Sequence, residues 1–314
     1  MADKIATREA YGNALAEIGA LNKDVVVLDA DLAEATKTIT FKKKFPDRFF
    51  DCGIAENNMM GVAAGLATTG KIPFASTFAM FAAGRSFDQV RNSIGYPHLN
   101  VKIGATHAGI TVGEDGATHQ CNEDIGLMRT IPGMVIINPS DAIEARCAVE
   151  AAVKYVGPVY MRFGRLAVSV INDKPEYKFE IGKGIHMAEG SDVTIVATGI
   201  MVEQALIARE MLLAEGISAA VINIHTIKPI DKEILISSAQ QTGAIVTTEE
   251  HNIIGGLGSA VCETLAGVCP VPVVRHGIED EFGKSGPAKE LLEYYKLNAA
   301  GICEKVKLAL SMKI

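Results

Sequence analysis

The residue of this sequence that is most informative about acid–base chemistry is Glu56. It follows a short apolar segment that ends at Asp51, and residues 61–67 after it are mostly glycine and alanine. This pattern predicts a helix that begins near Glu56 and packs closely against another element. The free N–H groups at a helix start stabilise a carboxylate, but a dry packing surface requires a partner with which the acid shares a proton. The alternative interpretation is a helix-initiating glutamate with no chemical role.

The second candidate is the glycine-bearing loop of residues 107–120, which follows an apolar segment. His107 and His119 could donate hydrogen bonds to hydroxyl or phosphate oxygens near neutral pH, and Asp115 could accept one from a sugar hydroxyl. Loops of this length are usually functional. The spacing of the two histidines, H-x11-H, matches no metal-ligand pattern, and no G-x-S-x-G sequence indicates a serine hydrolase.

These candidates lie at the ends of predicted strands. Short apolar segments alternate with helical ones, including a predicted helix at 80–94, which predicts an α/β fold with two doubly wound, mainly parallel-sheet domains. The predicted strands are 25–28, 48–51, 72–77, 101–105, 134–137 and 159–162 in the first sheet, and 193–199, 219–224, 244–248 and 272–274 in the second. Ligands of such sheets bind beyond the carboxyl ends of the strands. Glu56, Phe78, His107 and Arg162 lie at or just after such ends, so we expect them to share a site.

The chain divides into two predicted domains, residues 1–172 and 191–314, joined by a polar, lysine-rich linker at 173–190. A length of 314 residues is more typical of two domains than of one. The net charge of −7 argues against nucleic-acid binding, and no segment has the pattern of a membrane span or a secretory leader. The six cysteines form no C-x-x-C pair, which favours free thiols in a reducing, cytoplasmic compartment.

Two glycine-rich segments lack the spacing of nucleotide-binding motifs. Residues 255–259 lack the third glycine of G-x-G-x-x-G. Residues 277–285 have five residues between their glycines where a P-loop has four, and this spacer is acidic, which would repel phosphate. We expect Ser285 instead to cap a helix that has Pro287 in its first turn.

Four motifs, in their order along the chain, resemble those of transketolases. They are Asp51-Cys52-Gly53-Ile54-Ala55-Glu56, Ser76-Thr77-Phe78-Ala79-Met80-Phe81, Thr106-His107 and Gly113-Glu114-Asp115-Gly116-Ala117-Thr118-His119-Gln120. The resemblance extends over essentially the whole chain. It identifies residues 1–172 as similar to the pyrimidine-binding domain of that family, which binds thiamine diphosphate, and residues 191–314 as similar to its C-terminal domain.

One motif of full-length transketolases has no counterpart in this sequence. The family's N-terminal domain carries a G-D-G motif that helps to hold Mg²⁺ and the diphosphate of thiamine diphosphate, and no G-D-G occurs here. The resemblance therefore implies the C-terminal subunit of a split transketolase, active only with an N-terminal partner subunit. That partner would supply most of the groups that bind the metal ion and the diphosphate. The two kinds of chain would form an α2β2 assembly.

The resemblance also implies residues that bind the cofactor. Glu56 matches the glutamate that hydrogen-bonds N1′ of the aminopyrimidine and thereby promotes loss of the thiazolium C2 proton. Phe78 and Phe81 match the aromatic residues beside that ring. The family's third aromatic position is Gly84 here. Without the resemblance, the two phenylalanines could equally be core residues at helical spacing.

The residues implied to bind a sugar phosphate are Arg8, His107, Asp115, His119 and Arg162. His107, which we also count as catalytic, and Asp115 match residues that contact sugar hydroxyls. The remaining three match ligands of the phosphate, for which an arginine fork is well suited. Without the resemblance, either arginine could form a surface ion pair. A serine that the family places nearby is absent, because the chain has Ala35 and Thr36 there.

Three functions compete at this point. The resemblance implies transfer of a two-carbon ketol unit between ketose and aldose phosphates, as in the pentose phosphate pathway. The alternative is a subunit of a related thiamine enzyme, either 1-deoxyxylulose-5-phosphate synthase or the β subunit of the first component of a 2-oxoacid dehydrogenase. The dehydrogenases need no polyol loop, and the synthase is normally one long chain. A non-catalytic partner is the third reading, but it would not need Glu56 or the histidine loop.

Overall fold

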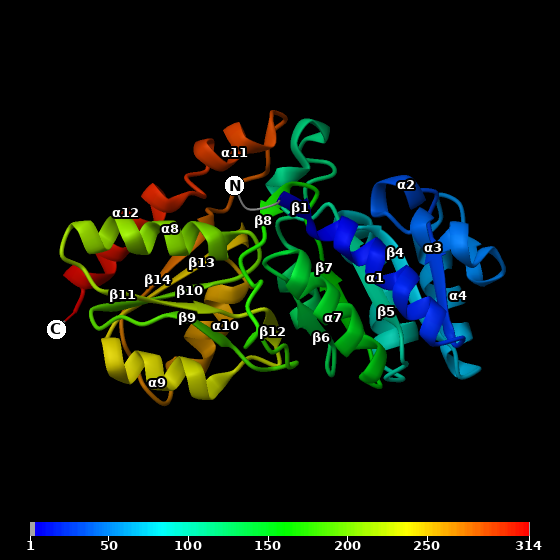
Figure 1. Cartoon of the computed structure of the whole chain (residues 1–314), viewed down its shortest axis with the longest axis horizontal. Coiled ribbons are helices and arrows are strands. Elements are labelled where there is room, and N and C mark those ends of the chain that lie inside the picture. The colour runs from blue at the N-terminus through cyan, green and yellow to red at the C-terminus, as the bar shows by residue number, and fades with distance from the viewer. Residues whose placement is uncertain (1–3, 314) are drawn as a thin grey trace.

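The computed structural model of the chain describes residues 4–313, which form two α/β units. The units lie side by side, the first on the right of Figure 1 and the second on the left. Each unit has a central sheet with helices on both faces, so the predicted pair of doubly wound, mainly parallel sheets is confirmed. No helix in the described part of the chain is long and apolar enough to cross a membrane.

The first unit is built on a seven-stranded sheet. Its strands, in spatial order, are β12 (Thr226–Lys228), β6 (Val135–Ile137), β7 (Val159–Arg162), β5 (Lys102–Thr106), β4 (Ile72–Phe78), β2 (Val25–Asp29) and β3 (Phe49–Asp51). All pairs are parallel except β12 with β6. A separate antiparallel pair joins β1 (Lys4–Ala6) to β8 (Ala167–Ser169).

Both faces of this sheet are buried, because side chains alternate along each strand. Val25 and Val27 of β2 face a core that includes Tyr11, whereas Val26 and Leu28 face the opposite core. One face packs on α1 (Thr7–Leu21), α3 (Ile39–Lys44) and α7 (Ala142–Lys154). The other packs on α4 (Glu56–Thr68), α6 (Asp124–Arg129) and two π-helices, η2 (Met80–Arg85) and η3 (Val90–Gly95). Shorter elements are α2 (Ala33–Thr36), α5 (Phe87–Gln89) and the 3₁₀-helices η1 (Pro46–Arg48) and η4 (Ile110–Asp115).

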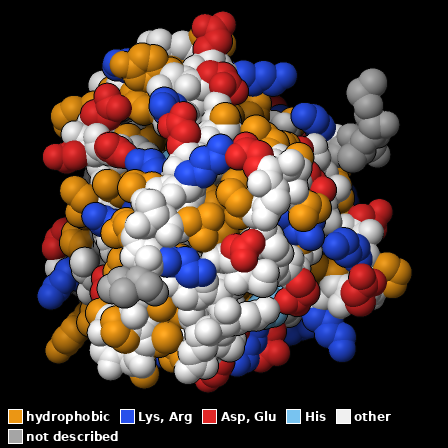
Figure 2. Space-filling view, turned by 90° about the vertical axis from the view of Figure 1, so that its left-hand side faces the viewer, with side chains coloured by type: hydrophobic (Ala, Val, Ile, Leu, Met, Phe, Trp, Pro, Cys, Tyr) orange, Lys and Arg blue, Asp and Glu red, His pale blue; other side chains and the backbone are white. Residues whose placement is uncertain are grey.

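The second unit has a five-stranded sheet. Its strands, in spatial order, are β14 (Val273–Ile278), β13 (Ile245–Asn252), β10 (Val193–Ala197), β11 (Ala219–Asn223) and β9 (Ile185–Ala188). Only β9, at the edge, is antiparallel. Helices α8 (Met201–Ala214), α11 (Ala288–Tyr294) and α12 (Ala299–Ser311) cover one face, and α9 (Lys232–Thr242) and α10 (Leu257–Leu265) cover the other. The outer end of this unit carries charges of both signs among apolar side chains (Figure 2).

Three local expectations were wrong. The range 173–190, expected to be only a linker, contains β9, which pairs with β11. The helix expected at 80–94 is instead two π-helical segments separated by a short α-helical turn. Ser285 does not cap α11, whose N-cap is Pro287; its hydroxyl donates instead to the Glu114 carbonyl oxygen at 2.5 Å.

The expectation of free thiols is met, because all six cysteines are unpaired.

The two units are joined by a shared sheet. Strand β12 leaves the second unit and pairs with β6 of the first, where Thr226 lies opposite Ile137. The Lys228 ammonium group then donates to the carbonyl oxygens of Arg129 and Ile131, at 2.8 and 2.6 Å. One apolar core also runs from the first unit into the second without interruption. The units therefore fold against each other rather than as separate bodies.

A buried ion pair lies at the same junction. Arg162 and Asp124 have 3% and 0% of their side chains exposed, and the Arg162 Nε donates to an Asp124 oxygen at 2.9 Å. The Arg162 Nη2 donates to the carbonyl oxygens of Cys121 and of Glu250, the latter on β13 of the second unit. The Tyr160 hydroxyl donates to Asp124 as well. Burial of Arg162 is thus compensated by one carboxylate and two carbonyl groups.

We expect Asp124→Asn to destabilise the chain strongly, because it leaves the buried Arg162 cation without its anion. Removing one partner of a buried pair costs about 3–5 kcal/mol of unfolding free energy, which urea unfolding measures. The control is Glu263→Gln, which removes the exposed partner of Arg129 and should cost less than about 1 kcal/mol. Equal, small effects from both variants would show that the junction does not depend on this pair.

Candidate active site

Glu56 is the first residue of α4, which confirms the predicted helix start. Its side chain is 2% exposed, and Nη1 of Arg85 donates to both carboxylate oxygens at 2.9 Å. The glycines of α4 depart from the expectation, because Gly61 and Gly65 lie on an exposed face, whereas Met59, Met60, Ala63 and Ala64 form the buried face. A buried acid with one charged partner therefore lies beyond the end of β3.

Two stacked phenylalanine rings, Phe78 and Phe81, form an aromatic wall at the end of β4. The rings of Phe78 and Phe81 are nearly parallel, at 9°, with centroids 5.7 Å apart. The His107 ring stacks on Phe78 at 3.8 Å, and the His119 ring meets both phenylalanines edge-on, at 6.4 and 5.5 Å. The guanidinium carbon of Arg85 lies 4.3 Å from the centre of the Phe81 ring. The structure thus brings together residues from the ends of β3, β4 and β5.

His107 is held in one tautomer by its neighbours. An arginine can only donate, so Nη1 of Arg8, 3.1 Å away, donates to the Nε2 lone pair of His107. In the neutral ring the proton is then on Nδ1, which donates to the Thr106 hydroxyl at 2.9 Å. Burial, with the charges of Arg8 and Arg165 as smaller causes, lowers the pKa of His107 to about 3. The imidazole is therefore neutral at physiological pH.

Two arginines lie beside this imidazole. Arg8 also donates to the carbonyl oxygen of Ala35 at 2.7 Å, and burial followed by repulsion from Arg165 lowers its pKa. Arg165 donates to the Val112 carbonyl oxygen and lies 3.5 Å from a carboxylate oxygen of Glu114. Sequence reasoning missed Arg165. Its position three residues after the end of β7 is the only signal that the sequence contains.

Arg162 does not join this cluster. It lies in the buried junction with Asp124, and it is 3% exposed. Asp115 is exposed at the end of η4, between Gly113 and Gly116, whose positive φ angles of 86° and 75° set the turns of the loop. Of the five residues expected to bind a sugar phosphate, the structure therefore groups Arg8, His107 and His119 around the aromatic wall.

The space beside Gly84 is filled by another residue. A Cβ atom built on Gly84 would lie 2.2 Å from Cε of Met80, so the end of the methionine side chain occupies the volume where a side chain at position 84 would begin. The missing third aromatic residue thus leaves no gap at this point. A flexible thioether replaces it next to the wall.

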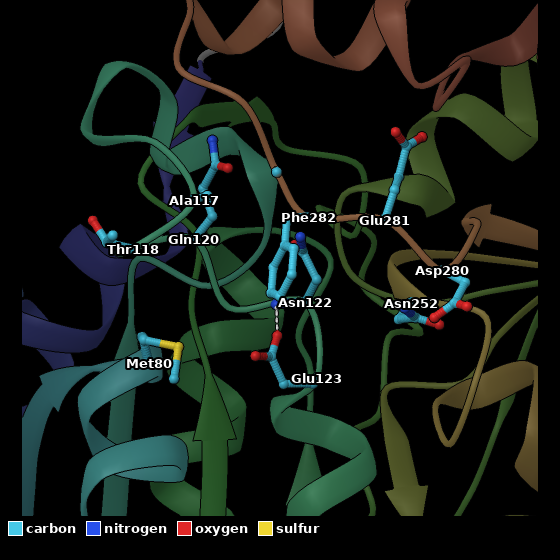
Figure 3. Close-up of a pocket in the computed structure, with 11 residues that line it drawn as sticks. Met80, Ala117, Thr118, Gln120, Asn122, Glu123, Asn252, Asp280, Glu281 and Phe282 are labelled. Atoms are coloured by element: carbon cyan, nitrogen blue, oxygen red, sulfur yellow. Dashed lines mark hydrogen bonds between the residues drawn. The ribbon is translucent and has the colours of Figure 1, made fainter.

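A cavity of about 670 Å³ opens between the first unit and the 280–283 segment of the second. Figure 3 shows Met80 and Thr118 on one side of it and Asp280, Glu281 and Phe282 on the other. Glu123 adds a third carboxylate to its lining. An acidic lining repels anions such as phosphate, whereas the guanidinium groups of Arg8 and Arg165, which do not line this cavity, attract them. No group of three or more His, Cys, Asp or Glu residues within 4–313 is arranged to hold a metal ion.

Two family models match the chain. The model of the transketolase pyrimidine binding domain matches residues 3–170, and the model of the transketolase C-terminal domain matches residues 182–302. Together they cover both α/β units and leave only the segment before β9 between them.

Individual proteins are similar over almost the whole chain. A Methanocaldococcus jannaschii protein named for the C-terminal section of a transketolase is 51% identical over 95% of this chain and 94% of its own length. A 6-deoxy-6-sulfo-D-fructose transketolase subunit of Clostridium sp. is 46% identical over 94% of this chain and 91% of its own. The solved structure of a split-gene transketolase, described as an inactive β4 tetramer, has a TM-score of 0.92 and 56% identity, covering 99% of this chain and 100% of that one.

Longer relatives match through one half only. Human transketolase is 36% identical over 97% of this chain, which corresponds to 49% of the human protein. The chain therefore belongs to the transketolase family, in which it corresponds to the pyrimidine-binding and C-terminal domains.

Proposed function

We propose that the chain is the subunit of a two-chain transketolase that activates the aminopyrimidine of thiamine diphosphate and binds the sugar. The observation that carries this proposal is Glu56, a buried carboxylate at the start of α4, which Arg85 links to Phe81, one of the two parallel rings. A flat aminopyrimidine fits such a wall, and its N1′ atom needs a carboxyl group with which to share a proton. Bound thiamine diphosphate would supply the carbon nucleophile for ketol transfer.

The sugar would bind on the side of His107. Nε2 of neutral His107 accepts from Arg8 Nη1 at 3.1 Å, so a sugar hydroxyl that displaced this contact would find an acceptor on His107 and would free an Arg8 donor for an anionic group. Arg165 suits the anionic group better than Arg162, because Arg165 is 39% exposed and Arg162 only 3%. Asp115 would accept a hydrogen bond from a sugar hydroxyl, and His119 would contact the anionic group. The relatives named for 6-deoxy-6-sulfo-D-fructose and apulose-4-phosphate leave a range of anionic sugars open.

A partner subunit would supply the metal and diphosphate site. The similar split-gene protein is described as an inactive tetramer of β chains, which supports a requirement for a second type of chain. The exposed face of α4 offers a place for such assembly, because it carries Gly61, Gly65 and Val62, which is 39% exposed. Ile54, two residues before the helix, is 77% exposed. We propose an α2β2 assembly with Mg²⁺ held mainly by the partner.

Reconstitution tests the proposal most simply. The chain alone should transfer no ketol units, and addition of the N-terminal subunit should restore transfer from a ketose phosphate to an aldose phosphate. Glu56→Gln in the reconstituted enzyme should lower kcat by about 10²- to 10⁴-fold, the usual contribution of a positioned acid–base group. Glu9→Gln, an exposed glutamate in the first turn of α1, is the matched control. Comparable activity of both variants would reduce Glu56 to a helix-initiating residue.

Arg165 gives a test of the anion site. Arg165→Ala should raise KM for a phosphorylated ketose donor by about tenfold or more, since a charge-assisted contact contributes about 1.5–3 kcal/mol. KM for an unphosphorylated donor such as erythrulose should hardly change. Steady-state kinetics with both donors measure this split, and Arg146→Ala on α7, which removes an exposed arginine with two carboxylate partners, is the control. An equal rise for both donors would remove Arg165 from the anion site.

The neutral state of His107 predicts how stability depends on pH. Its folded pKa of about 3 lies below the ordinary value of 6.5, so below pH 6.5 the unfolded chain binds a proton that the folded chain excludes. Stability from this group therefore falls as pH drops from 6.5 towards 3, by about 2 kcal/mol at pH 5. His107→Asn should flatten this dependence in urea unfolding at pH 5–7, with His186→Asn on β9 as the control. An unchanged slope would mean that His107 binds its proton in the folded state.

A further inference from the structure

We propose that Arg85 occupies the aminopyrimidine site in the free subunit and must leave before the cofactor binds. The proposal rests on the function proposed above, and it concerns one residue that neither the sequence motifs nor the comparisons assign to the site. Arg85 is the last residue of η2, directly after Gly84.

The guanidinium makes the same two contacts that an aminopyrimidine would need. Its Nη1 lies 2.9 Å from both oxygens of Glu56, and its central carbon lies 4.3 Å from the centre of the Phe81 ring. A guanidinium is planar and stacks on aromatic faces, as a pyrimidine does. A ring that stacked on the same face of Phe81 and bonded the same carboxylate would overlap Arg85. The two occupants are therefore mutually exclusive.

The two partners differ in how they are solvated, which favours release of the arginine. Arg85 has 48% of its side chain exposed, whereas Glu56 has 2%. An arginine this exposed regains water when it swings out, so the cost of opening the pair falls on the buried carboxylate. N1′ of the arriving ring would then give that carboxylate a new hydrogen-bond partner. The buried acid is thus never left without a partner in either state.

The local backbone makes this change feasible. Arg85 ends a π-helix, a wide form of helix that occurs mostly at functional sites. Gly84 before it has no side chain, and Ser86 after it has φ −102° and ψ 11°, outside regular helix. Among the hydrogen bonds of the described residues, the Arg85 side chain donates only to Glu56. For the guanidinium to turn towards solvent, only the pair with Glu56 and the stacking on Phe81 must break.

The test compares Arg85→Ala and Arg85→Lys with wild type in the reconstituted two-subunit enzyme. The dissociation constant of thiamine diphosphate is measured by calorimetry at fixed Mg²⁺, and the melting temperature is measured for the free chain. Arg146→Ala is the control for loss of an exposed arginine in an ion pair. We expect Arg85→Ala to lower the dissociation constant by about tenfold, because the competing group is gone, and to lower the melting temperature of the free chain. Arg85→Lys, which keeps the charge but not the planar group, should be intermediate in both.

Two results would overturn the proposal and can be told apart. If wild type binds the cofactor but Arg85→Ala binds it equally or more weakly, Arg85 is a permanent partner of Glu56 and does not block the site. If the reconstituted wild type and both variants all fail to bind thiamine diphosphate, the proposed function is wrong and this inference fails with it.

Discussion

The arrangement of the site depends on the buried junction at Arg162. Its guanidinium ties Asp124, the Cys121 carbonyl group and the Glu250 carbonyl group together across the two units. The Glu250 side chain adds a second tie, because it accepts from the backbone N–H of Thr111 at 2.7 Å. The loop that carries His107, Asp115 and His119 is therefore fixed from the second unit as well as from the first. Rigid support of this kind is what a substrate-binding loop needs, since small displacements of contacting groups are costly in rate.

Much of the fold could be predicted from the sequence, because apolar segments that are buried on both faces are continuous along the chain. The Val25–Asp29 strand and the start of α4 at Glu56 are examples. Strands β9 and β12 could not be predicted, because each forms through pairing with a distant strand rather than through a local pattern. The same holds for Arg162, because its partner Asp124 lies 38 positions earlier. A motif match places an arginine at a strand end but does not say which carboxylate it meets.

At the site itself, the resemblance to transketolases pointed to Glu56, the two phenylalanines and the histidines, and the structure places them beyond the ends of β3, β4 and β5. The resemblance did not indicate the residues that fill the space beside Gly84 and pair with Glu56. Met80 fills the space beside Gly84, and Arg85 satisfies the buried carboxylate. Both lie in η2, where wide helical turns replace the regular helix expected at 80–94. Propensity and periodicity do not reveal a π-helix, because a single turn with i→i+5 hydrogen bonds is too short to leave a pattern of its own in the sequence.

The central claim is that Glu56 promotes loss of a proton from a cofactor whose diphosphate is held by another chain. The most direct measurement is the rate of hydrogen–deuterium exchange at C2 of thiamine diphosphate bound to the reconstituted enzyme, followed by NMR after acid quench. We predict that Glu56→Gln slows this exchange by at least about a hundredfold while the cofactor stays bound. Exchange at the wild-type rate in that variant would contradict the account.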